Sequence, residues 1–253
     1  VAFVFALALL NGGAVAQRAA IRQAPKNAEQ FYAQGVELLG KGEAGRAIAS
    51  FRSALRLKPD FAEAHNALGL ALGRQGQIDA AIDSLREAAR LRPDFAEARA
   101  NLGLALQQKG DLDAAIVELR AAVDHQPDSA AFRSAFGFAL GQKGLLDGAV
   151  AEFEYAVKLD PDFHEAQFRL GVTRWLRQQY DAAIAPLRAS VKLKPDHVES
   201  HYYLGLSLQK TGQLREAIDQ LEEAAKLNPK LADVQAAIGN ALLAEREPEG
   251  AAE

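Results

Sequence analysis

The sequence contains no cysteine, which excludes disulfide bonds, thiolate metal sites and cysteine nucleophiles. It also lacks methionine, even at position 1, so we expect the chain to begin after its true start or at a non-standard start codon. Aromatic residues make up only 7% of the chain, and its net charge at pH 7 is -4. Because phosphate binding needs a net basic surface, this charge argues against nucleic acid as a main partner.

The first 16 residues are apolar or small and carry no charge, and they read VAFVFALALLNGGAVA. An apolar run, a Gly break and then Ala14-Val15-Ala16 are typical of a secretory signal, which predicts cleavage before Gln17. A retained membrane anchor is the alternative, but the run is shorter than the ~20 residues that a spanning helix needs. We therefore expect an exported protein, periplasmic or secreted, with no stable membrane insertion after cleavage.

Prolines recur at a constant spacing of 34 residues, which is the period of helix–turn–helix repeats. They are Pro59, Pro93, Pro127, Pro161, Pro195 and Pro229. Counting back from them gives complete units at 28–61, 62–95, 96–129, 130–163, 164–197 and 198–231, and a partial unit at 232–253. In this frame the eighth position is always Gly (Gly35, Gly69, Gly103, Gly137, Gly171, Gly205, Gly239) and the twentieth always Ala (Ala47, Ala81, Ala115, Ala149, Ala183, Ala217, Ala251).

This pattern resembles the tetratricopeptide family over residues 28–253. The resemblance implies an all-α fold, an α-solenoid in which helix–turn–helix units stack into a right-handed superhelix. Gly and Ala let the two backbones of a unit approach closely, while larger apolar residues form one face of each helix. We expect first helices near repeat positions 1–14 and second helices near 17–30, after a signal peptide at 1–16 and a flexible lead-in at 17–27.

Residues that end helices recur with the same period. In five units a glycine that tolerates a left-handed cap conformation stands where the first helix must end, at Gly42, Gly76, Gly110, Gly144 and Gly212. Most prolines are followed by Asp with Glu three residues later, as in Asp60 and Glu63, which predicts a capping box with Asp as the N-cap. In the seventh unit we expect a second helix to start near Pro248. The exposed apolar face of the last helix lacks a capping helix, so we expect the chain to self-associate through this end.

No catalytic signature is present: there is no G-x-S-x-G, no P-loop and no dinucleotide fingerprint. His197 and His201 lie four residues apart, but HVESH is not the H-E-x-x-H of zinc proteases, and a zinc site needs three or four ligands. We interpret the histidines as solvent-exposed and the carboxylates as helix caps and solvated faces. The sequence therefore predicts no enzyme activity, no cofactor and no metal site.

In tetratricopeptide proteins the first helix of each unit lines a concave surface, mainly through its second, fifth, sixth, ninth and twelfth positions. In this chain those positions gather aromatic residues in units four to six. The predicted peptide-binding residues are Phe138, Phe168, Arg169, Trp175, Tyr202, Tyr203 and Leu206, together with Asn101 in unit three. Exposed aromatics near an Arg are typical of binding hot spots. The same rings could instead pack on one another between adjacent first helices, and the sequence leaves both interpretations open.

Unit five departs from the repeat at three positions. Arg174 replaces the Leu of the eleventh position, Gln178 replaces the turn glycine, and Pro186 lies inside the second helix. Pro186 is expected to remove one helical hydrogen bond. Because local inconsistency often marks function, these departures are further candidates for a functional region.

Two ligand-binding subclasses of the family are not matched. The Lys–Asn clamp for a C-terminal carboxylate is absent from the fifth and ninth positions, and Asn101 is the only asparagine at the sixth position, where an asparagine ladder would lie. We hypothesise a non-catalytic scaffold of the bacterial cell envelope that binds an extended peptide or a partner helix. The alternatives are the substrate-recruiting arm of a larger enzyme, such as a glycosyltransferase, and a structural spacer or self-assembling array.

Overall fold

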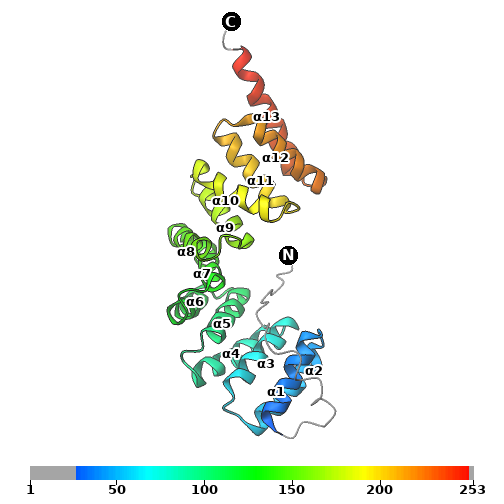
Figure 1. Ribbon diagram of the computed structural model, residues 1–253, viewed down its shortest axis with the longest axis vertical. Coiled ribbons are helices and arrows are strands. Elements are labelled where there is room, and N and C mark those ends of the chain that lie inside the picture. The colour runs from blue at the N-terminus through cyan, green and yellow to red at the C-terminus, as the bar shows by residue number, and fades with distance from the viewer. Residues whose placement is uncertain (1–26, 251–253) are drawn as a thin grey trace. The chain divides into compact units, whose positions relative to one another are not determined.

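The computed structural model describes residues 27–250, which form thirteen α-helices and no β-strand (Figure 1). The first helices of the repeats are α1 (Ala28–Gly40), α3 (Ala62–Arg74), α5 (Ala96–Lys109), α7 (Ala130–Gln142), α9 (His164–Leu176), α11 (Val198–Lys210) and α13 (Ala232–Gly250). The second helices are α2 (Ala44–Leu57), α4 (Ile78–Leu91), α6 (Leu112–His125), α8 (Leu146–Leu159), α10 (Tyr180–Leu193) and α12 (Leu214–Leu227). The predicted all-α fold of helix–turn–helix units is confirmed.

The helices belong to two compact units, residues 1–126 and 127–253, which hold α1–α6 and α7–α13. Within each unit, every first helix but α13 packs against the second helix that follows it, and each second helix packs against the next first helix. First helices of neighbouring repeats also contact one another, as α9 and α11 do. This pattern of stacked helical hairpins is that of an α-solenoid.

The eighth-position glycines allow the close helix approach that the sequence predicts. A Cβ atom added at Gly171 would lie 2.4 Å from Leu187 Cγ, and one at Gly205 would lie 2.6 Å from Leu221 Cγ. Both leucines are fully buried and belong to the second helix of the same repeat. A larger residue at the eighth position would therefore push the two helices of a repeat apart.

Turns between first and second helices depend on one left-handed residue. The predicted turn glycines all have positive φ, from 75° at Gly76 to 92° at Gly110. Gln178, which replaces glycine in unit five, has a φ of 58° and so adopts the same left-handed conformation. The turn geometry is thus imposed by the packing of the two helices even where the residue disfavours it.

The predicted capping boxes are wrong at the start of most first helices. The N-cap of α3 is Phe61 rather than Asp60, and no side chain caps that helix. Phe61 is only 9% exposed and its backbone N–H donates to the Lys58 carbonyl, so burial of the aromatic ring places the helix start one residue after the aspartate.

A recurring contact at the fourth repeat position was not recognised from the sequence. Its side chain reaches the carbonyl of the repeat proline six residues earlier, as Arg99 does with Pro93 at 2.7 Å and His201 with Pro195 at 2.9 Å. The same contact is made by His65, Arg133 and Gln167. His201 is only 4% exposed, so its interpretation as solvent-exposed is wrong, and its role is to bind the end of the preceding helix.

The last helix is longer than the sequence predicts. No second helix starts near Pro248, because α13 runs from Ala232 to Gly250 without a break. Arg246 stands at the position that is a turn glycine in five of the complete repeats and Gln178 in unit five, and in α13 this position stays helical. The signal peptide, residues 17–26 of the lead-in and Ala251 lie outside the described residues, whereas Asn27 caps α1.

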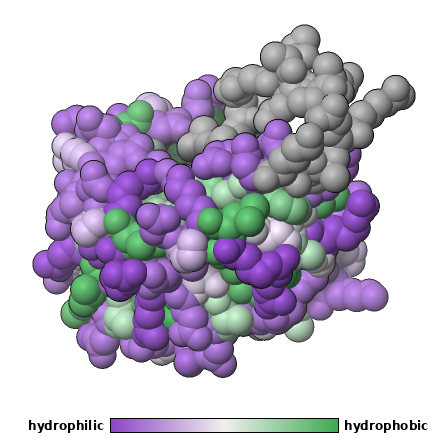
Figure 2. Space-filling model, turned by 90° about the horizontal axis from the view of Figure 1, so that it is seen from below, coloured by the Kyte–Doolittle hydropathy of each residue, from purple (hydrophilic) through white to green (hydrophobic). Residues whose placement is uncertain are grey.

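Hydrophilic side chains dominate the face drawn in Figure 2, where hydrophobic residues form small separate areas. Within residues 27–250, no helix combines the length and the apolar character that crossing a membrane requires.

Candidate functional site

A cluster of aromatic rings joins the first helices α9 and α11. The Phe168 ring lies 4.7 Å from His197 and 6.3 Å from Tyr203, measured between centroids. Tyr203 in turn lies 5.4 Å from both Trp175 and Tyr202. The structure therefore brings four of the predicted site residues into one continuous group.

Three of these rings lie against the apolar core. Phe168, Trp175 and Tyr203 are half-buried and pack against a core cluster that includes Leu187 and Leu204. The indole Nε1 of Trp175 is buried without a hydrogen-bond partner in the described part of the chain. These contacts favour the packing interpretation for the three rings, because their main contacts are with one another and with the core.

Arg169 is held between two first helices. Its guanidinium carbon lies 3.4 Å from the centroid of the Phe138 ring on α7, and its Nε donates to Glu165 at 2.5 Å. Burial lowers the pKa of Arg169 below its usual range, and Glu165 opposes this effect. Since an arginine remains charged in proteins, Arg169 joins α7 to α9 through a cation–π contact.

A groove lies between α11 and α13, with a volume of about 680 Å³. Two predicted site residues, Tyr202 and Leu206, line it. The remaining lining residues are Gln209, Lys210, Asp233, Ala236, Ala237, Asn240 and Ala244. The lining residues on α13 include the second, fifth, sixth and ninth positions of unit seven. These are positions that line the concave surface in the family, so the same rule applied to unit seven would have identified them.

The groove combines an apolar floor with polar groups that can donate and accept hydrogen bonds. Leu206 and three alanines supply apolar surface, and the side-chain amides of Gln209 and Asn240 each offer donors and an acceptor. Burial raises the pKa of Tyr202, and Asp233 raises it further, so the Tyr202 hydroxyl is protonated at neutral pH. A concave, partly apolar surface with a few polar groups is the kind of surface at which ligands bind.

Asn101 does not present a free amide. It is 2% exposed, and its Nδ2 donates to Asn66 Oδ1 at 2.9 Å. It lies in the first compact unit, whereas the other predicted site residues lie in the second. Its observed role is a partly buried hydrogen bond between α3 and α5.

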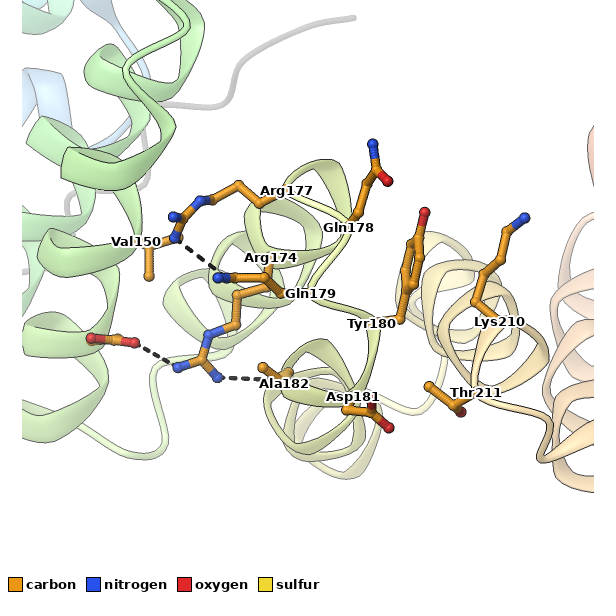
Figure 3. A pocket seen from close by; sticks show the side chains of 11 residues that line it. Val150, Arg174, Arg177, Gln178, Gln179, Tyr180, Asp181, Ala182, Lys210 and Thr211 are labelled. Atoms are coloured by element: carbon orange, nitrogen blue, oxygen red, sulfur yellow. Dashed lines mark hydrogen bonds and ion pairs between the residues drawn. The ribbon is translucent and has the colours of Figure 1, made fainter.

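A second hollow, of about 550 Å³, lies beside the turn of unit five (Figure 3). There Arg174 Nη1 donates to the Ala182 carbonyl at 2.8 Å, and Nη2 pairs with Glu154 at 2.6 Å. Pro186 has no N–H, so the Ala182 carbonyl, four residues earlier, lacks its helical partner. Arg174 replaces the hydrogen bond that Pro186 removes, and α10 continues unbroken. Two departures of unit five thus compensate for each other structurally.

Residues 27–250 contain no group of three or more His, Asp or Glu side chains placed to hold a metal ion. The stacked helical hairpins and the groove between first helices define a helical-repeat protein of the kind that serves as an interaction module. Family models described as TPR repeat and tetratricopeptide repeat match residues 35–76, 74–110, 96–129 and 202–253. The chain belongs to the tetratricopeptide-repeat family. A model of the anaphase-promoting complex, cyclosome, subunit 3 matches residues 142–224.

Solved structures share the fold at low sequence identity, and no curated protein sequence matches the chain significantly. PilF of Pseudomonas aeruginosa is 18% identical with a TM-score of 0.74, over 83% of this chain and 95% of that one. YrrB, described as a TPR protein with an unusual peptide-binding site, is 19% identical with a TM-score of 0.65. The match covers 74% of this chain and 96% of YrrB. A chain of the APC/C hetero-tetramer Cut9–Hcn1 is 21% identical with a TM-score of 0.69. The match covers 87% of this chain but only 44% of the length of that chain.

Proposed function

We propose that this protein is a non-catalytic scaffold that binds an extended peptide of a partner protein in the groove between α11 and α13. The observation that carries the proposal is the groove itself, where Leu206 and the alanines form an apolar floor beside the amides of Gln209 and Asn240. An extended peptide leaves its backbone N–H and C=O groups unpaired, and side-chain amides can satisfy both.

The charged groups at the groove define the peptide further. Lys210 and Asp233 both line it and carry opposite charges, so a bound segment with one acidic and one basic residue matches both. The apolar floor accepts a small or medium apolar side chain between them. The similarity to YrrB, whose structure is described as having an unusual peptide-binding site, supports a peptide ligand for this fold.

The proposal is tested by selecting peptides from a displayed random library on the full chain and measuring their affinity for variants. We expect Leu206→Ala and Asn240→Ala each to weaken binding by about 1 kcal/mol or more, because they remove apolar contact and a backbone hydrogen bond. Gln235→Ala is the matched control, since Gln235 is an exposed α13 residue outside the groove. Selected peptides that bind all three variants as tightly as the wild type would contradict the proposal.

The aromatic cluster is tested with the same peptides. Because Trp175 packs on the core, Trp175→Ala is expected to lower the free energy of unfolding, by less than the about 3–5 kcal/mol of a fully buried tryptophan. If the ring is instead a direct contact, peptide affinity falls and the thermal midpoint stays unchanged.

We propose further that the scaffold acts in the bacterial cell envelope. The Ala14-Val15-Ala16 site supports export with loss of residues 1–16. Amino-terminal sequencing of the protein from its native host tests this point. A chain that still begins at Val1, or one found only in the cytoplasm, contradicts it.

A further inference from the structure

The hollow beside the turn of unit five adjoins the peptide groove, because one residue lines both. Lys210, at the end of α11, lines the groove between α11 and α13 and also this hollow of about 550 Å³. Gln178, in the turn of unit five, and Tyr180, at the start of α10, line the hollow as well. A peptide that lies in the groove and continues past Lys210 therefore meets the turn of unit five.

Three polar side chains extend to the same side of this hollow. Figure 3 shows those of Gln178, Tyr180 and Lys210 pointing in one direction, away from Asp181. Within residues 27–250, no hydrogen bond or ion pair engages the side chain of any of the three. They carry an amide, a hydroxyl and an ammonium group, and each of these groups donates hydrogen bonds. The hollow therefore presents three donors whose hydrogen bonds are open to a ligand.

The charges of the hollow favour a negative group beside these donors. Arg174 and Arg177 each form an ion pair with an acidic residue of α8. Lys210 and Asp181 are the charged lining residues that have no ion pair in the described part of the chain. Because Asp181 points away from the three donors, a carboxylate next to Lys210 is attracted by the ammonium group and lies apart from the Asp181 carboxylate.

Two of the three donors are departures of unit five from the repeat. Tyr180 stands at the seventeenth position, where the other five complete units have Ala, Ile or Leu. Gln178 stands where those units have the turn glycine, and its φ of 58° is a conformation that side chains disfavour. Such backbone strain is concentrated at functional sites. A ligand that contacts the Gln178 amide accounts for a glutamine at a position where glycine has no strain.

We propose that Gln178, Tyr180 and Lys210 bind the carboxylate of an Asp or Glu side chain in the segment of the bound peptide that continues beyond the groove. The ammonium group supplies the charge, while the amide and the phenol donate hydrogen bonds to the carboxylate oxygens. The Tyr180 ring packs edge to face on Trp175, 6.3 Å away between centroids, which fixes the direction of its hydroxyl. This inference rests on the proposed peptide groove and adds to it the residues that select an acidic side chain.

The test uses the full chain and peptides selected on it from a displayed random library, synthesised with both ends blocked so that only side chains carry carboxylates. We expect an Asp or Glu at one fixed position of these peptides. Replacing it by the matching amide should weaken binding to the wild type about tenfold, and to Lys210→Gln about twofold or less. Gln178→Gly and Tyr180→Phe should each weaken binding of the acidic peptide about threefold or more and leave that of the amide peptide unchanged.

The controls separate loss of the site from loss of structure or of charge alone. Lys192→Gln removes an exposed lysine of α10, and Tyr155→Phe removes the hydroxyl of a tyrosine on α8 that is 43% exposed; neither residue lines the hollow or the groove. Both should bind the acidic peptide like the wild type. Gln178→Gly restores the residue of the other turns, so its thermal midpoint should not fall while its affinity does.

The outcomes separate this inference from the groove proposal. If Leu206→Ala weakens binding but the preference for the acidic peptide is the same in wild type, Gln178→Gly and Tyr180→Phe, the carboxylate site is overturned and the groove stands. Selected peptides without a fixed acidic residue overturn the site in the same way. A preference that depends on Lys210 alone overturns the role of the unit-five turn. If neither the groove variants nor the hollow variants change the affinity, both proposals fail.

Discussion

At the scale of the residue, Gln178 carries backbone strain that its counterparts avoid. Its φ is 58°, whereas the five equivalent positions are glycines with φ from 75° to 92°. We expect Gln178→Gly to raise the free energy of unfolding by up to about 1.5 kcal/mol. Removing the side chain from the left-handed conformation raises the free energy of unfolding by about 1–2 kcal/mol. The greater freedom of Gly in the unfolded chain lowers it by about 0.4–1 kcal/mol. Urea unfolding followed by circular dichroism measures the change.

The converse variant is the control for this prediction. Gly212→Gln places a side chain at a φ of 79° in the next repeat, and its added Cβ meets nothing within 4 Å, so only the backbone conformation is disfavoured. It should lower the stability by a similar amount. If Gln178→Gly is also destabilising, the Gln178 side chain has a function that its geometry does not reveal.

Residue roles could be predicted from the sequence where the repeat frame specifies backbone geometry. The left-handed turns and the Gly notches followed from residue type and register, and the structure confirms both. The burial of Asn101 and His201 could not be predicted, because each depends on a partner about 20 or more residues away: Asn66 for one and Gln220 for the other. A polar side chain at an inward position looks the same in sequence whether its partner is water, a ligand or another repeat.

At the scale of the element, a hydrogen bond from α9 to α10 compensates for the proline inside α10. Arg174 donates to the Ala182 carbonyl that Pro186 leaves without a helical partner. We expect Arg174→Leu to lower the free energy of unfolding by about 1 kcal/mol in the wild type. With Pro186→Ala in place, the backbone N–H of residue 186 can reach that carbonyl, and the same Arg174→Leu change should cost little.

A double-mutant cycle of these two substitutions, measured by urea unfolding, checks the coupling. Glu154→Ala is the control, since it removes only the exposed ion pair with Arg174, which is worth about 0–1 kcal/mol. Strictly additive effects of Arg174→Leu and Pro186→Ala would show that the two departures of unit five are unrelated.

We expect two histidines at the contact between α9 and α11 to make the second compact unit sensitive to acid. The rings of His164 and His197 lie 4.7 Å apart, and burial is the main cause that lowers the pKa of each; Glu165 and Glu199 partly oppose it. Histidine in the unfolded chain has an ordinary pKa of about 6.5, so below this pH the unfolded chain binds more protons than the folded chain does. The contribution of this pair to stability is therefore expected to be full above this pH and to be lost as the pH drops below it.

We expect the thermal midpoint of this unit to fall between about pH 7.5 and pH 5, and His164→Phe to reduce the fall. A phenyl ring keeps the stacking that His164 has with Phe168, at 6.5 Å between centroids, without a group that can be protonated. His125→Phe, at an exposed position of α6, is the comparison variant. An unchanged pH profile in His164→Phe would refute the assignment of the acid sensitivity to this pair.

Element boundaries were the most predictable part of the fold. The second helices occupy repeat positions 17–30 in all six complete units, as the register predicts, because Gly turns and prolines mark both ends. The exception is the seventh unit, where α13 continues past the turn position to Gly250. The groove was predicted only in part, since Tyr202 and Leu206 were found but Gln209 and Asn240 were not.

At the scale of the whole molecule, the contacts that hold each compact unit together are between neighbouring repeats. The core of the second unit includes separate clusters, one around Leu187 and Leu204 and another around Leu221 and Ala237. In such arrays, stability is the sum of the repeats and of their nearest-neighbour interfaces. A fragment that keeps whole repeats should therefore keep its native structure.

We expect residues 127–253, expressed alone, to fold and to bind the peptides that the full chain selects. The boundary at Gln126 falls between α6 and α7, so no helix is cut, and every residue lining the groove lies within the fragment. Circular dichroism should show a helical chain with a cooperative thermal transition, and peptide affinity should stay within about twofold of the full chain because no groove contact is removed. The Leu206→Ala fragment is the binding control. A fragment that is unfolded, or that folds but no longer binds the selected peptides, would show that the site needs residues before 127.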